Sequence, residues 1–351
     1  MSADRAVSTV MDVAMALLFI SASVLLIGIH LHNSDDKFDE NRADRTAELL
    51  GESTISVQYS LEDAEPIADR EGVYHRTEYG SATGLLADAA VANVHVDGTR
   101  IRSTGDEFET AVGASVESAL IGSNRHFYVT AEWEPYDDAA INGTATAGER
   151  PPPNEDVSSV TLTASSGIPA VDSDEIESAY LNADTYWNDY LGDRTDFVES
   201  PENASFEAAG MVIGNAIVDG YFPPAATQRS LESQGLSHEL TVSQYERLVK
   251  SLEYEFTGTT APAHHGPLKR EEADAVEANA QVVRGIADAD TFGRNGLGHW
   301  LGEDLQTALA DEIAAIDEQY DGERRDEEIA ALLADEVSTD EVTITIQTWY
   351  V

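Results

Sequence analysis

Cysteine is missing from this sequence of 351 residues. The chain can therefore form no disulfide bond, and it offers neither a thiolate metal ligand nor a cysteine nucleophile. Folding has to rest on the burial of apolar side chains. The length is sufficient for one large domain or two smaller ones.

Basic residues are scarce, with 20 Lys and Arg against 66 Asp and Glu, which leaves a net charge of −46. Only Lys37, Lys250 and Lys269 are lysines. Nucleic-acid binding is disfavoured, because contacts to phosphate need clustered Lys and Arg. In dilute buffer so many like charges repel one another, whereas at molar salt the Debye length shrinks to ~3 Å and most of that repulsion disappears. The composition therefore predicts an acidic protein adapted to a halophilic environment.

Recognisable catalytic and metal-binding motifs are also missing. Residues 293–302 are glycine-rich, but they lack the last glycine of a G-x-G-x-x-G motif, and a loop with a helix cap is the preferred interpretation. Residues 288–293 begin like a calcium loop, yet Phe292 occupies a position that needs an oxygen ligand. His264 and His265 are adjacent in a proline-flanked loop, where two neighbouring imidazoles do not close a tetrahedral zinc site by themselves. We therefore expect no enzyme activity, no cofactor and no metal site.

One long apolar run is present, close to the amino terminus. From Val13 to Ile29 seventeen residues carry no charge, and from Ala6 onward only Asp12 interrupts the run. At ~1.5 Å per residue, a helix of this length can cross a hydrocarbon core of ~30 Å. The sequence therefore predicts a short leader (1–5) and a single N-terminal transmembrane helix (6–31).

The flanks of this run predict its orientation. Arg5 precedes the run, while Asp35 and Asp36 follow it. The positive-inside tendency then places the amino terminus in the cytoplasm and the body outside the cell, as a single-pass protein of the cell membrane. Two glycosylation sequons, which begin at Asn142 and Asn203, are compatible with an extracytoplasmic body.

Residues 4–27, DRAVSTVMDVAMALLFISASVLLI, place a short charged leader ending in Arg directly before Ala-Val-Ser and a long apolar segment. This pattern resembles the amino terminus of haloarchaeal type IV pilins and pilin-like proteins. The resemblance implies that a prepilin peptidase cleaves between Arg5 and Ala6, and that the partners are the membrane, this peptidase and other pilin-like subunits in a homo- or hetero-oligomer. Because the body is longer than that of a typical major pilin, the resemblance favours a minor or accessory component.

Asp12 is the one charged residue inside the predicted membrane helix. A carboxylate within a bilayer is costly unless it is neutralised or lies near the interface, so it marks a candidate functional position. The pilin resemblance implies a role in assembly, in which this acid pairs with the amino group of a neighbouring subunit. The alternative is that Asp12 lies at the headgroup level of an uncleaved anchor and has no role.

Local patterns in the rest of the chain are typical of an α+β body. The polar residues 134–156, which include a run of three prolines, predict a long exposed loop. Alternation of apolar and polar residues predicts strands over 55–59, 94–96, 126–133, 157–164 and 342–351.

The predicted body combines a small antiparallel sheet with a large helical region. The segments in chain order are a helical extension or linker (32–51), an α+β sheet region (52–168), a helical region (169–335) and a C-terminal strand that returns to the sheet (336–351).

Two functions from different classes follow. The first is a membrane-anchored, pilin-like structural component of a type IV pilus or related secretion assembly in a halophilic archaeon. The alternative is a bitopic cell-surface binding protein whose N-terminal anchor is not cleaved. The leader separates them, because only the first function requires the removal of residues 1–5.

Overall fold

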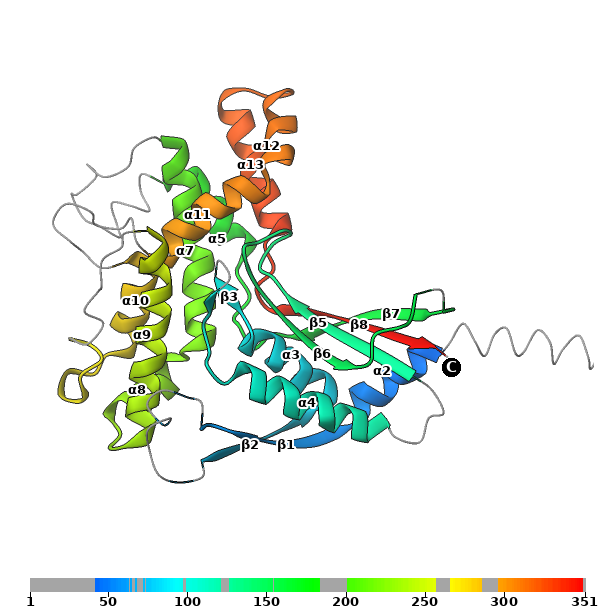
Figure 1. Cartoon of the computed structure of the whole chain (residues 1–351). Coiled ribbons are helices and arrows are strands. Elements are labelled where there is room, and N and C mark those ends of the chain that lie inside the picture. The colour runs from blue at the N-terminus through cyan, green and yellow to red at the C-terminus, as the bar shows by residue number, and fades with distance from the viewer. Residues whose placement is uncertain are drawn as a thin grey trace, which may run out of the picture.

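The computed structural model describes an α+β fold (Figure 1). It describes residues 42–349 except for 63, 65–66, 68–71, 73, 97–98, 121–125, 154, 184–200, 257–265 and 286–295.

The centre of the fold is a six-stranded sheet with the strand order β4-β3-β6-β5-β8-β7, in which all neighbours are antiparallel. The strand from the end of the chain lies between β5 and β7, where Ile346 faces both Val129 and Val160. The strands are β3 (His95–Val96), β4 (Thr99–Arg100), β5 (His126–Trp133), β6 (Ile141–Gly148), β7 (Ser158–Ser165) and β8 (Glu341–Trp349).

Three helices cover one face of this sheet: α2 (Arg42–Glu52), α3 (Ala82–Ala92) and α4 (Gly105–Leu120). The side chain of Ser81 caps α3 by accepting a hydrogen bond of 3.0 Å from the backbone N–H of Gly84. Leu85 and Leu86 of α3 are buried against the strands, as are the alternate residues of β5 and β8. The hydrophobic core of this half therefore lies between the sheet and the three helices.

The predicted loop over 134–156 is wrong, because it contains β6. The inward positions of β6 are Ile141, Gly143, Ala145 and Ala147, all buried. Small residues give little hydrophobic signal in the sequence, but they let α3 approach the strand closely. A Cβ atom on Gly143 would lie 2.2 Å from the carbonyl oxygen of Ala90, so this position admits only glycine.

β3 pairs with β6 only at Ile141 and Asn142, and further along this edge of β6 the side chain of Glu109 on α4 takes the place of a strand partner. Its carboxylate accepts from the backbone N–H of Thr146 at 2.8 Å and from the side-chain amide of Asn93 at 2.6 Å. The same amide of Asn93 donates to the carbonyl of Thr144 at 3.1 Å. This part of the strand edge is therefore paired by side chains in place of another strand.

A separate two-stranded ribbon packs against α3 and α4 from the side opposite to the sheet (Figure 1). Its antiparallel strands are β1 (Thr54–Ser60) and β2 (His75–Ser81). Val57 is buried in this contact, whereas Tyr79 is 74% exposed.

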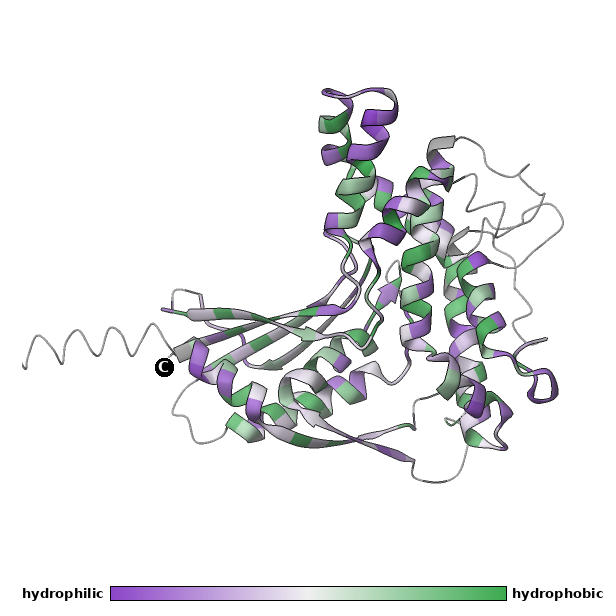
Figure 2. Cartoon of the chain, turned by 180° about the vertical axis from the view of Figure 1, so that it is seen from behind, coloured by the Kyte–Doolittle hydropathy of each residue, from purple (hydrophilic) through white to green (hydrophobic). Residues whose placement is uncertain are grey.

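The helical region is inserted in the chain between β7 and β8. Its central helix is α7, which contacts α5, α10 and α11. The elements are α5 (Ser173–Leu181), α7 (Pro201–Tyr221), α8 (Pro224–Glu232), α9 (Leu236–Phe256), the 3₁₀ helix η1 (Arg270–Glu272), α10 (Ala275–Arg284), α11 (Leu297–Ala308), α12 (Ala310–Asp317) and α13 (Gly322–Glu336). The hairpin of α12 and α13 projects from the body and has a hydrophilic tip (Figure 2).

The contact between α7 and α11 is built on glycine. Gly210 and Gly214 of α7 face Gly298 and Gly302 of α11, with a four-residue spacing on both helices. A Cβ on Gly210 would lie 2.2 Å from the carbonyl oxygen of Gly298, and one on Gly302 would lie 2.7 Å from the Cα of Glu207. The two backbones therefore touch, which larger residues at these positions would prevent.

One part of the predicted fold class is corrected. No helix among the described residues is long and apolar enough to cross a membrane. The longest, α7 and α9 with 21 residues each, carry acidic residues such as Glu207 and Glu239 and pack within the body. The single N-terminal transmembrane helix is therefore unsupported, and the fold class is corrected to α+β with a small sheet and a helical region. The predicted segment 6–31 lies outside the described residues.

Candidate functional site

The first described helix, α2, is fixed to the sheet through one face. Ala43, Thr46 and Leu50 are buried, and Ala47 is half-buried beside them. The spacing i, i+3, i+4, i+7 puts these residues on a single stripe, which packs on β7, β8 and α3. On the other side of α2, Leu49 is 55% exposed. The helix is thus held firmly by the sheet and still presents an apolar side chain to solvent.

The position of α2 determines where the preceding residues join the body. It lies beside β7 and β8, close to the C-terminal end of β8 (Figure 1). Residues 1–41 are therefore attached at this end of the sheet, and the helical region lies at the other end.

The opposite face of the sheet carries mostly hydroxyl groups. Thr130, Thr161 and Thr345 lie in register on β5, β7 and β8, and the hydroxyls of the last two are 3.4 Å apart. Glu132 and Glu341 are the only carboxylates among the outward side chains of β5 to β8. The full outward set is His126, Tyr128, Thr130, Glu132, Asn142, Thr144, Thr146, Ser159, Thr161, Thr163, Ser165, Glu341, Thr343, Thr345, Gln347 and Trp349, of which Trp349 is buried.

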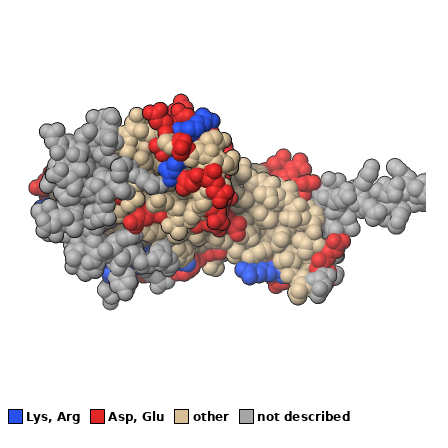
Figure 3. All heavy atoms as spheres, turned by 90° about the horizontal axis from the view of Figure 1, so that it is seen from above, with Lys and Arg blue, Asp and Glu red and all other residues tan. Residues whose placement is uncertain are grey.

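We call these outward side chains the open face. Apart from the β6 edge, where the hydroxyl of Thr146 donates to Oε1 of Glu109 on α4 at 3.1 Å, the helices α2, α3 and α4 lie on the other face of the sheet. Figure 3 looks onto the molecule from this side and shows a surface largely without charged residues between the α12–α13 hairpin and the end where α2 lies. In a chain of net charge −46, this is a surface on which a second molecule meets little electrostatic repulsion.

Asp304 on α11 joins the helical region to the sheet. Its Oδ2 accepts hydrogen bonds from the hydroxyl of Tyr136 at 2.8 Å and from the backbone N–H of Ala140 at 3.0 Å. Burial and the charge of Asp304 raise the pKa of Tyr136 well above its ordinary value. The connection between β5 and β6 is therefore anchored, and with it the edge of the open face.

His299 forms a second polar link between helices. Its Nδ1 lies 3.0 Å from Oε1 of Glu207 on α7, and its Nε2 lies 3.5 Å from Oε1 of Glu303 one turn further along α11. The protonated imidazole would form ion pairs with both carboxylates. No group of three or more His, Asp or Glu side chains in the described part of the chain is arranged to hold a metal ion.

The structure places only two of the predicted site residues. Asn142 points outward on β6, where its side-chain amide donates to the carbonyl of Ala139 at 2.9 Å, and Asn203 is exposed near the start of α7. They lie on different elements and form no common site. Arg5, Ala6 and Asp12 lie outside the described residues.

Two features of this surface were missed by sequence reasoning. The outward side chains of β6 had a usable signal, because Asn142, Thr144 and Thr146 alternate with the inward Ile141 and small residues. The sequence carried no signal for the exposure of Leu49, because Leu49 and Leu50 are identical neighbours and only Leu50 is buried.

No curated protein sequence and no solved structure matches the chain. The profile of a family of unknown function, DUF7284, matches residues 11–349. This match covers most of the sequence, and the chain therefore belongs to the DUF7284 family.

Proposed function

We propose that this chain is a pilin-like structural component of a type IV pilus or related secretion assembly, and that it acts at the cell membrane by assembling with other subunits. The observation that carries the proposal is the docking of α2 along an antiparallel sheet, since α2 is the first described helix after residues 4–27, whose sequence resembles pilins. The role is structural and not catalytic, and prepilin peptidase processing between Arg5 and Ala6 is part of the proposal.

The geometry of α2 suits this role for a mechanical reason. In a subunit that assembles through its amino-terminal residues, these residues need a rigid connection to the body, so that the body has a fixed orientation in the assembly. The buried stripe of α2, which ends at the fully buried Leu50, provides a rigid connection to β7 and β8. Leu49 remains free to pack against the corresponding helix of a neighbouring subunit.

Charge also restricts how copies of this chain can meet. Each copy carries a net charge of −46, so contacts between acidic surfaces are unfavourable at low salt. The open face is a surface where subunits can approach without placing many carboxylates together, whereas exposed Glu48 and Glu52 flank Leu49 on α2. The open face and α2 both belong to the sheet half of the body.

Replacing Leu49 tests this proposal without altering the core. We expect Leu49→Gln to reduce by several-fold the fraction of full-length chain that is cross-linked into larger species in membranes of a halophilic host. The thermal unfolding midpoint should stay the same, because the side chain is 55% exposed.

Val276→Gln on α10 is the matched control, since it also removes an exposed aliphatic side chain (65% exposed) but lies in the helical region. It should leave cross-linking unchanged. Equal cross-linking of wild type and Leu49→Gln would remove the role we give to α2.

Asp12→Ala examines the predicted assembly role of Asp12 separately. We expect fewer cross-linked species with an unchanged amount of chain in the membrane. Unchanged cross-linking would leave Asp12 without a function in assembly.

A further inference from the structure

Two adjoining cavities lie between the β1–β2 ribbon and the helical region. The smaller has a volume of about 240 Å³ and the larger one of about 400 Å³. They share Tyr59, Arg76 and Thr104 in their walls, so they adjoin, and we treat them together as one cleft. We call it the arginine cleft, because Arg76, Arg102 and Arg247 line it.

The larger cavity has an unusual lining for so acidic a chain. None of its described lining residues is Asp or Glu, although the sequence contains 66 of them and only 20 Lys and Arg. Arg76 comes from β2 and Arg247 from α9. Hydroxyl groups complete the wall: Tyr59, Ser103, Thr104, Ser230, Ser237 and Ser243.

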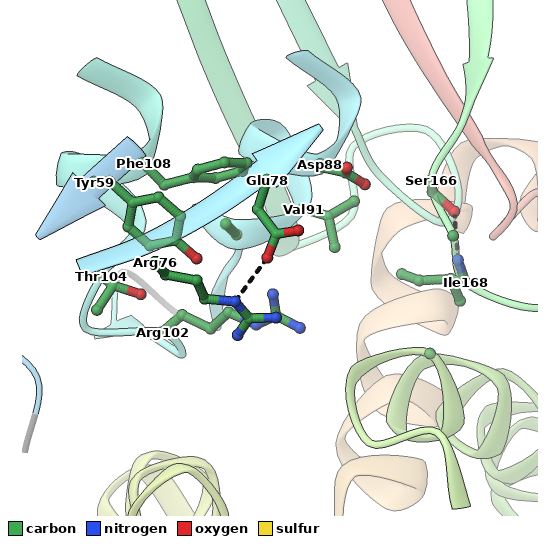
Figure 4. A pocket seen from close by; sticks show the side chains of 13 residues that line it. Tyr59, Arg76, Glu78, Asp88, Val91, Arg102, Thr104, Phe108, Ser166 and Ile168 are labelled. Atoms are coloured by element: carbon green, nitrogen blue, oxygen red, sulfur yellow. Dashed lines mark hydrogen bonds and ion pairs between the residues drawn. The ribbon is translucent and has the colours of Figure 1, made fainter. Parts of the chain in front are cut away.

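Arg102 adds a guanidinium group to the smaller cavity. It forms no hydrogen bond or ion pair with any described residue. Its contact is with the ring of Tyr221, whose centroid lies 4.7 Å from the guanidinium carbon. Stacking of this kind uses the flat face of the guanidinium and leaves the N–H groups at its edge available. Figure 4 shows Arg102 and Arg76 extending into the same part of the cavity.

Two carboxylates also line the smaller cavity, beside its arginines. Glu78 pairs with Nε of Arg76 at 2.7 Å. Asp88 is reached by water, yet the surrounding walls desolvate it enough to raise its pKa, against the opposing effect of Arg102. These carboxyl groups can accept hydrogen bonds from hydroxyls of a ligand. The smaller cavity therefore offers guanidinium donors and carboxylate acceptors together, and the larger cavity adds hydroxyl groups.

We propose that the arginine cleft binds a small hydroxylated oxyanion, of the class of sugar phosphates or sugar sulfates. Arg102, Arg76 and Arg247 hold the oxyanion through charge-assisted hydrogen bonds, and Asp88 and Glu78 accept from the hydroxyls of the ligand. This inference is independent of the proposed assembly function, since the cleft lies away from α2 and the open face.

Direct contacts are needed for such binding in this chain. The net charge of −46 repels anions at long range, and at molar salt the Debye length of ~3 Å removes any steering beyond the nearest neighbours. Only guanidinium groups that line the cavity itself can then select an anion over water and chloride. Three such groups in one cleft meet this requirement.

The test is calorimetric titration of the full-length chain at molar potassium chloride with three probes: glucose 6-phosphate, inorganic phosphate and glucose. We expect glucose 6-phosphate to bind, phosphate to bind more weakly, and glucose to give no heat of binding. Arg102→Gln and Arg247→Gln should each weaken glucose 6-phosphate binding by about tenfold, the effect of one lost charge-assisted hydrogen bond.

Arg229→Gln is the matched control. Arg229 lies on the neighbouring helix α8, where its Nε donates to the carbonyl of Ala225 at 3.0 Å, and it lines neither cavity. This variant should bind as the wild type does. Equal unfolding midpoints for all variants exclude a loss of binding through misfolding.

Three results would overturn the inference: no binding of glucose 6-phosphate, equal affinity in the wild type and in both cleft variants, or glucose binding as tightly as its phosphate. Cross-linking of the cleft variants in membranes should stay at the wild-type level, so failure here is distinguishable from failure of the assembly proposal.

Discussion

Buried tyrosines are the residues whose ionisation most affects the stability of the body. The hydroxyl of Tyr221 donates to the carbonyl of Val91, and that of Tyr245 donates to Oδ1 of Asn279. Burial raises the pKa of both hydroxyls above the ordinary value of 10.0. In the folded chain these groups therefore stay protonated at a pH where the unfolded chain has lost the proton.

This difference predicts an alkaline loss of stability. Because the folded pKa is the higher one, the stabilisation is complete below pH ~10 and decreases as the pH rises further, when only the unfolded state releases protons. Tyr221→Phe should lower the free energy of unfolding at pH 8 by about 1 kcal/mol through the lost hydrogen bond, and should make the fall between pH 9 and 11 shallower.

Urea unfolding across this pH range measures both effects. Tyr79→Phe, at a side chain that is 74% exposed on β2, is the control and should match the wild type throughout. A Tyr221→Phe curve parallel to that of the wild type would contradict the assigned role of Tyr221.

Residues of the candidate sites differ in whether a local sequence pattern could predict them. Arg5, Ala6 and Asp12 follow from a local pattern and stay predictions. Arg102 had no local signal, because its significance comes from Tyr221, more than a hundred residues further along the chain, and from cavity walls that other elements contribute. Sites assembled by tertiary packing are invisible to local patterns.

At the scale of elements, strands rich in β-branched and aromatic residues were predictable and strands of small residues were not. The strand predicted over 126–133 has the same bounds as β5, and the alternation that begins at Val342 predicted β8. The alternation of β6 was hidden by glycine and alanine, which the close approach of α3 requires. Leu305, Leu309, Ile313 and Ile316 share helical spacing, yet α11 and α12 meet at Leu309, whose φ and ψ of −97° and 21° interrupt the helix.

The glycine contact between α7 and α11 gives a prediction for these two helices. Gly302→Ala should destabilise the body by about 2 kcal/mol or more, because its Cβ would lie 2.7 Å from backbone atoms of α7 that cannot move aside easily. The free energy of unfolding from urea titration measures the loss.

Gly51→Ala in α2 is the matched control, since a Cβ there has nothing within 4 Å. It should be neutral or stabilise the protein by up to about 1 kcal/mol, the difference in helix propensity between the two residues. If both substitutions changed the free energy of unfolding by similar amounts, the contact between α7 and α11 would not require glycine at position 302.

For the whole molecule, electrostatic repulsion opposes compactness in addition to the loss of conformational entropy. A net charge of −46 on 351 residues is balanced by few cations, and ion pairs such as Arg324 with Glu327 are exposed and weak. Ion pairs within the chain therefore cannot offset the repulsion between carboxylates, and screening by dissolved salt has to reduce it.

Stability should accordingly rise steeply with salt. Between about 0.1 M and 1 M potassium chloride the Debye length falls from ~10 Å to ~3 Å, and we expect the unfolding midpoint to rise by roughly 10 °C. Calorimetric scans measure this shift, and a neutral osmolyte at equal osmolality should produce much less of it. A midpoint that is insensitive to salt would refute halophilic adaptation as the reason for the acidic composition.

The arrangement of the whole chain supports assembly through its amino-terminal end, because α2 joins that end to the sheet while the helical region lies away from it. The membrane helix predicted from sequence has no counterpart among the described helices. Membership of the DUF7284 family leaves the function to be established by experiment.

The most direct test of the assembly proposal is the mature amino terminus, determined by mass spectrometry of the full-length chain purified at high salt from membranes of a halophilic host. The account predicts a chain that begins at Ala6, as prepilin-type processing requires. A chain that retains residues 2–5 would contradict it.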